Sequence, residues 1–70
     1  MICTLDVLVA DHGSVVVFAG TDTADGLPVV VAVDHRMAQD IIDALADGES
    51  VPAFVEPWQV LGRGVAAVLP

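Results

Sequence analysis

The stretch PVVVAVDHRMAQDIIDALADG, residues 28–48, decides the fold because it changes from the pattern of a strand to that of a helix. Its first part, Pro28 to Val33, is rich in β-branched residues, which predicts a strand. Proline suits the first position of a strand, where a missing N–H is tolerated. Both faces of this strand are apolar, so we expect it to be covered on both sides.

The second part of the stretch predicts a helix over residues 35–47. Asp34 suits the N-cap position, because an aspartate side chain accepts a hydrogen bond from a free N–H of the first turn. Apolar residues then recur at helical spacing at Met37, Ile41, Ala44 and Leu45. Gly48 provides the C-terminal stop signal. One side of this helix is therefore expected to pack on the sheet while the other side faces solvent.

A hairpin is predicted before this stretch. Strand-like segments run from Ile2 to Ala10 and from Val15 to Gly20, and the turn between them, residues 11–14, offers Gly13 for a positive φ. Simple alternation in the first segment predicts one apolar face formed by Cys3, Leu5, Val7 and Val9. The second segment is apolar on both faces, and the polar residues 21–26 connect it to the next strand.

Strand-like segments also follow the helix. A fourth strand is predicted from Val51 to Val55, and the pattern resumes from Trp58 to Leu61 after the interruption at Glu56-Pro57. Gly62-Arg63 fits a two-residue hairpin turn with glycine first, which predicts a closing strand over residues 64–69.

These elements predict a single small α+β domain over residues 1–70. Its antiparallel sheet has about five or six short strands in the order βββαββ(β), with one helix packed on one face. A helix of about 13 residues is roughly 20 Å long and cannot cover both faces of such a sheet. The uncovered face must be hidden by closure of the sheet into a small barrel, by a second copy of the chain, or by another protein. We expect a homo-oligomer, because a core of this size supplies only about 3–5 kcal/mol and a lone Cys3 forms no internal disulfide.

The charge balance restricts the partners. The formal net charge is −8, and the permanent cations are Arg36 and Arg63. Direct nucleic-acid binding is not expected, because it depends on several basic residues that neutralise phosphates. Apolar runs are too short for a membrane span, and a lone Cys3 fits a reducing compartment, so we expect the cytoplasm of a bacterial host. The acids either keep an apolar chain soluble or form a face that binds a basic partner or imitates nucleic acid.

Two Asp-His pairs form the candidate metal site. Asp11-His12 ends the first strand and Asp34-His35 ends the third, and alternate strands of a meander run parallel, so both pairs are expected at one end of the sheet. Carboxylates and imidazoles suit zinc or a similar ion, but the spacing matches no ligand signature, and turn formation and helix capping explain both aspartates. We therefore expect no metal or other cofactor. No catalytic motif accompanies these residues, so no enzyme activity is expected.

The predicted partner-binding residues lie on the helix and after it. Asp40, Asp43 and Asp47 recur at spacings of three and four, and Glu49 follows just past the helix end. A solvated helix face is the default interpretation of these acids, but Asp43 and Asp47 lie toward the negative end of the helix dipole, which costs stability and adds weight to a recognition surface. Trp58, the only tryptophan, is either an exposed anchor for a partner or a lid on the core.

The run from Val33-Asp34-His35-Arg36 through the helix to Val55-Glu56-Pro57-Trp58-Gln59-Val60 resembles small proteins of actinobacteria and their phages that have no assigned activity. The sequence contains no Lys, Asn or Tyr, which is the bias expected from a GC-rich genome and fits a source of this kind. We thus expect a non-enzymatic, self-associating protein-interaction module, a phage-type accessory protein that binds or modulates a host protein. The alternatives are a small structural or decoration subunit of a virion and an acidic mimic of nucleic acid.

Overall fold

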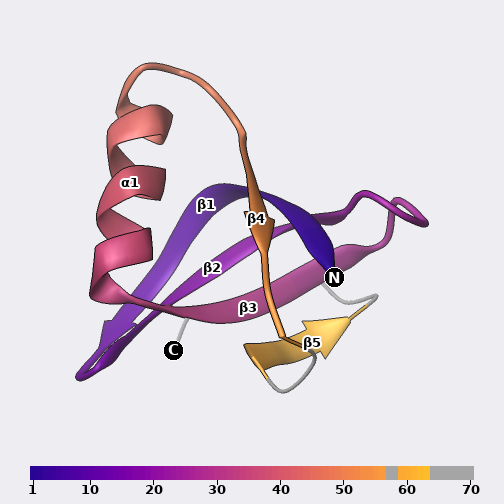
Figure 1. Cartoon of the computed structure of the whole chain (residues 1–70), viewed down its shortest axis with the longest axis horizontal. Coiled ribbons are helices and arrows are strands. Elements are labelled where there is room, and N and C mark those ends of the chain that lie inside the picture. Colours follow the sequence, from indigo (N-terminus) through magenta and orange to yellow (C-terminus); the bar gives the residue numbers. More distant parts are fainter. Residues whose placement is uncertain (57–58, 64–70) are drawn as a thin grey trace.

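A five-stranded antiparallel sheet and one helix make up the part of the chain that the structure, a computed structural model, describes: residues 1–56 and 59–63 (Figure 1). The elements are β1 (Ile2–His12), β2 (Val15–Asp22), β3 (Pro28–Asp34), α1 (His35–Ala46), β4 (Val51–Phe54) and β5 (Val60–Arg63). The predicted α+β class and the predicted order of elements are confirmed. The strands lie side by side in the order β4-β1-β2-β3-β5, so across the described residues the sheet is open and not a closed barrel.

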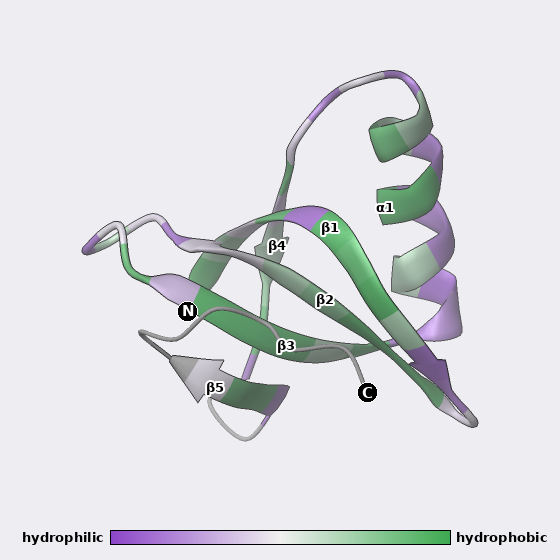
Figure 2. Ribbon diagram, turned by 180° about the vertical axis from the view of Figure 1, so that it is seen from behind, coloured by the Kyte–Doolittle hydropathy of each residue, from purple (hydrophilic) through white to green (hydrophobic). Residues whose placement is uncertain are grey.

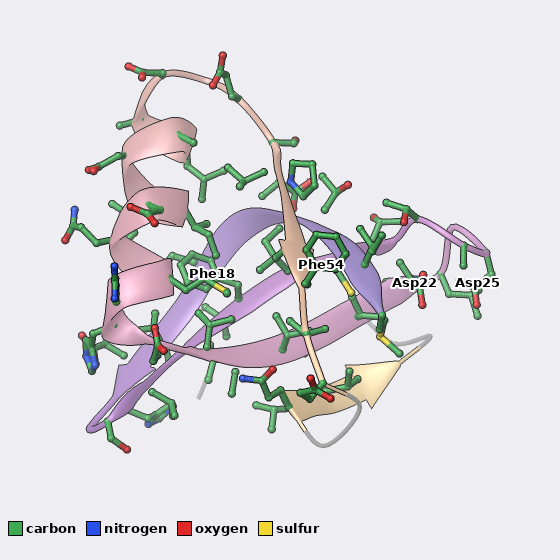
Figure 3. All side chains as sticks on the ribbon, viewed as in Figure 1. Phe18, Asp22, Asp25 and Phe54 are labelled. Atoms are coloured by element: carbon green, nitrogen blue, oxygen red, sulfur yellow. The ribbon has the colours of Figure 1, made fainter. Side chains whose placement is uncertain are left out.

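Short-range hydrogen bonds shape the two connections between the first three strands. Gly13 has the expected positive φ of 61° in the β1–β2 turn, where His12 pairs with Val15. Asp22, the last residue of β2, is buried, and its Oδ1 accepts a hydrogen bond from the Ala24 N–H of the following loop at 2.8 Å. Figure 3 shows that the β2–β3 loop, which follows Asp22 and carries Asp25, lies at the end of the sheet away from α1.

β1 departs from simple alternation. Its pairing with β2 shifts between Leu5 and Val7 and again between Leu8 and Ala10, which is the pattern of β-bulges. Cys3 and Leu5 are buried as predicted, but Val7 is exposed and Val9 only half-buried. The prediction that all four share one buried face was therefore wrong, because each extra residue changes the face to which the following side chains point.

Both ends of α1 are capped as the sequence predicts. The Asp34 side chain accepts a hydrogen bond from the Met37 N–H at 2.8 Å. At the other end Gly48 has φ 81°, its N–H donates to the Leu45 carbonyl at 3.0 Å, and the Glu49 N–H donates to the Ala44 carbonyl at 3.1 Å. This pair of bonds is the Schellman motif, which satisfies carbonyls at the end of a helix.

The core lies between α1 and one face of the sheet. Figure 2 shows the hydrophobic side of α1 turned toward the strands and its hydrophilic side turned outward. The buried apolar residues are Cys3, Leu5, Val16, Phe18, Val29, Val31, Val33, Ala38, Ile41, Ala53 and Val55, with Leu45, Val51 and Val60 packed against them. The prediction of one helix on one face of the sheet is confirmed. On the other face of the central strands, Ala19, Val30 and Ala32 are half-buried.

The C-terminal region differs from the sequence prediction. Gly62 and Arg63 do not form a hairpin turn; they belong to β5 and pair with Val30 and Val29 of β3. The alternation of apolar residues did not show that this segment would reach β3, because strand pairing is set by the whole sheet. The predicted closing strand over 64–69 lies outside the described residues. Among the residues that are described, no helix has the length and apolar character needed to cross a membrane.

Candidate functional site

The two Asp-His pairs do meet at one end of the sheet. The Nε2 atom of His35 lies 3.0 Å from Oδ1 of Asp11, which connects the start of α1 to the end of β1. His12 pairs with Val15, and Val15 pairs in turn with Asp34, so the remaining two residues lie in one row across β1, β2 and β3. The predicted proximity of the two pairs is therefore confirmed.

Metal binding at these residues has little structural support. The Asp34 carboxylate is occupied by the N-terminal hydrogen bond of α1, which leaves it a capping role. Within residues 1–56 and 59–63, no three His, Cys, Asp or Glu side chains are grouped so that they could hold a metal ion. Both partners of the His35–Asp11 pair are exposed, so this contact between α1 and β1 contributes little to stability.

The acidic residues of α1 form one exposed stripe. At about 100° per residue, Asp40, Asp43 and Asp47 fall within about 60° of one another around the helix axis, and all three are exposed. Asp43 accepts a hydrogen bond from Gln39 Nε2 at 2.9 Å. The last turn of α1 contains no basic residue, so the partial negative charge there is not offset from within the helix.

The two other predicted partner-binding residues lie beyond the helix. Glu49 is exposed in the connection between α1 and β4, close in sequence to the C-cap residue Asp47. Trp58 lies outside the described residues.

A groove lies between α1 and β4. Its lining is mostly apolar, and it adjoins the acidic stripe at Asp40. Its cavity has a volume of about 230 Å³, and its lining residues are Met37, Asp40, Ile41, Val51, Pro52, Ala53 and Phe54. We call this the α1–β4 groove. Ile41 and Ala53 belong to the core and form its floor, whereas Met37 and Asp40 are exposed at its rim. A second hollow, lined by Asp34, Arg36, Met37 and Asp40, adjoins it at the start of α1.

Among the residues that the structure describes, Phe54 is the most exposed large apolar residue, at 76%. It pairs across the β1–β4 ladder with Ile2, which is 41% exposed. In Figure 3 Phe54 stands beside β4, while Phe18 of β2 lies next to α1 in the core. Phe54 is therefore not part of the core, and with Ile2 it forms an exposed apolar pair at the edge of the sheet.

Sequence reasoning placed the acidic stripe correctly but missed Phe54 and the groove. The signal for Phe54 was present, because Ala53 and Val55 are buried, and period-two alternation then turns Pro52 and Phe54 outward. The groove had no such signal, because α1 and β4 meet only through tertiary packing.

The chain matches no family model, and no curated protein or solved structure is significantly similar to it.

Proposed function

We propose that this chain is a non-enzymatic protein-interaction module that binds another protein at the α1–β4 groove. The observation that carries the proposal is the position of this apolar groove beside the exposed acidic stripe, with Asp40 belonging to both. A groove of about 230 Å³ is smaller than the roughly 300 Å³ or more of typical small-molecule pockets, which suits one or two side chains of a protein partner better than an enclosed substrate.

The proposal includes self-association through a surface that adjoins the groove. Ile2 and Phe54 face the same side of the sheet and form an exposed apolar pair. They lie on the face of the sheet that α1 does not cover, where two copies could join, and Phe54 also lines the α1–β4 groove, so the two surfaces meet at this residue. The resemblance to actinobacterial and phage proteins supports a role as an accessory protein acting on a host protein, and it directs the search for the partner to an actinobacterial lysate.

Affinity purification with a matched variant tests the function. Tagged wild-type protein and Met37→Gln are each incubated with lysate, and captured proteins are identified by mass spectrometry. Met37 is exposed at the groove rim, so the substitution adds a polar group there with no change in net charge. We expect a protein that the wild type captures and the variant loses. Equal capture by both proteins would show that the groove is not the binding site.

A further inference from the structure

We propose that the occupant of the α1–β4 groove is a basic segment of another protein, which inserts an apolar side chain between Met37 and β4 and places Lys or Arg against the acidic stripe. This inference rests on the proposed function and specifies the chemistry of the partner at the same site. It depends on two properties of the groove, the charge at its rim and the backbone at its edge.

The rim charge favours a basic occupant. Asp40 lines the groove, Asp43 and Asp47 continue from it along the exposed side of α1, and exposed Glu49 lies in the connection that joins α1 to β4. The cation beside them is Arg36, which lines the adjoining hollow. A second copy of the chain, with its own net charge of −8, would bring like charges together at this rim. A segment with several Lys or Arg would instead be attracted to it.

The edge of β4 disfavours an added strand. The Val55 N–H donates to the Met1 carbonyl at 3.0 Å, so Val55 directs its backbone groups toward β1. Because these groups alternate along a strand, Pro52 and Phe54 direct theirs away from β1. Pro52 has no N–H to donate, so a strand added at this edge would lose one of its hydrogen bonds. We therefore expect the occupant to bind through side chains in the groove rather than by extending the sheet.

A random peptide library provides a direct test. Displayed peptides of about twelve residues are selected for binding to immobilised wild-type protein. Peptides that also bind the variant Met37→Gln, which has the same net charge, are then removed, because charge alone explains their binding. Far-UV circular dichroism and thermal melting first verify that the variant is folded, and Met37→Ala replaces it if it is not. We expect the enriched peptides to combine a net positive charge with one or two large apolar residues.

The charge requirement is then measured with one enriched peptide. Asp40→Asn removes an acid at the groove rim, and Asp25→Asn removes an acid from the β2–β3 loop while keeping the side-chain oxygen that accepts from the Leu27 N–H. We expect Asp40→Asn to weaken binding about two- to fivefold at low salt, in the range for exposed charge pairs, and Asp25→Asn to leave it unchanged. A peptide with Gln in place of each Lys and Arg should bind more weakly still.

Each other outcome contradicts the inference in a distinct way. Enriched peptides that depend on Met37 but are neutral or acidic would refute the basic partner while supporting the groove as a binding site. An absence of Met37-dependent peptides would refute the partner chemistry, and the lysate comparison would then decide the proposed function separately. If Met37→Gln instead lowers the mass of the protein in light scattering, the occupant of the groove is a second copy of the chain.

Discussion

Gly20 of β2 lies so close to the backbone of β1 that a Cβ atom at this position would collide with the carbonyl group of Thr4. The same atom would lie 2.9 Å from the Cα of Leu5. Gly20 pairs with Leu5 immediately before the first bulge of β1, where the pairing shifts by one residue. A residue without a side chain therefore lets β1 bend across β2 at the point where its alternation changes.

Gly20→Ala is expected to destabilise the protein by about 3 kcal/mol or more, because the colliding atoms belong to the backbone and cannot move aside by a rotamer change. A loss of this size would unfold a large fraction of so small a domain. Gly48→Ala is the control: its φ of 81° is strained for alanine, but open space surrounds it, so we expect a loss of roughly 1–2 kcal/mol. Urea unfolding of both variants measures the difference, and equal stabilities would disprove the close approach.

Ile41 and Ile42 are neighbours on α1 with opposite environments, at 1% and 37% exposed. We expect Ile41→Ala to cost about 2–4 kcal/mol, because it removes a buried side chain from the core between α1 and the sheet. Ile42→Ala makes the same chemical change outside the core and should cost under about 1 kcal/mol. Thermal unfolding of the two variants checks the predicted helix face, and a larger loss at Ile42 would show that the face is wrong.

The double variant Asp43→Gln, Asp47→Gln should be as stable as the wild type or slightly more stable. Both acids lie near the negative end of the α1 dipole, where each exposed charge costs about 0.3–1 kcal/mol. Loss of the Gln39–Asp43 hydrogen bond partly offsets this gain. Asp34→Ala at the opposite end should lower stability by about 0.5–2 kcal/mol, because it removes the N-cap. Chemical denaturation at low salt tests both, and a marked loss in the double variant would indicate an unrecognised structural role of the stripe.

The His35–Asp11 contact should contribute little to stability. Its side chains are 51% and 64% exposed, so solvent screens the interaction. A double-mutant cycle with His35→Ala and Asp11→Ala should give a coupling energy of about 0.2–1 kcal/mol that decreases as salt is added. A larger, salt-independent coupling would mean that the contact holds the start of α1 more firmly than its exposure indicates.

Light scattering at micromolar concentration tests self-association. We expect a mass above the 7.2 kDa of one chain. Phe54→Ser should reduce that mass, because it removes a highly exposed apolar side chain from the face that α1 does not cover. A monomeric wild type would contradict the homo-oligomer, and an unchanged mass in Phe54→Ser would place the contact elsewhere.

Local signals in the sequence determined α1 and its junction with β3. Asp34 and Gly48 act through hydrogen bonds to groups within a few residues, so their roles as N-cap and helix stop could be predicted from neighbours alone. The spacing of Asp40, Asp43 and Asp47 likewise follows from helix geometry and predicted their common exposed side. Short runs of β-branched and other apolar residues bounded by turn residues identified β1 to β4 for the same reason.

Tertiary structure alone decided how these elements combine. Pairing of β5 with β3 and of β4 with β1 joins residues far apart in the chain, and alternation does not specify which edge a strand will occupy. The bulges of β1 depend on the register with β2 and on the close approach at Gly20, so alternation failed beyond Leu5. The α1–β4 groove exists because β4 lies at a sheet edge next to α1, and no local sequence pattern predicts that position.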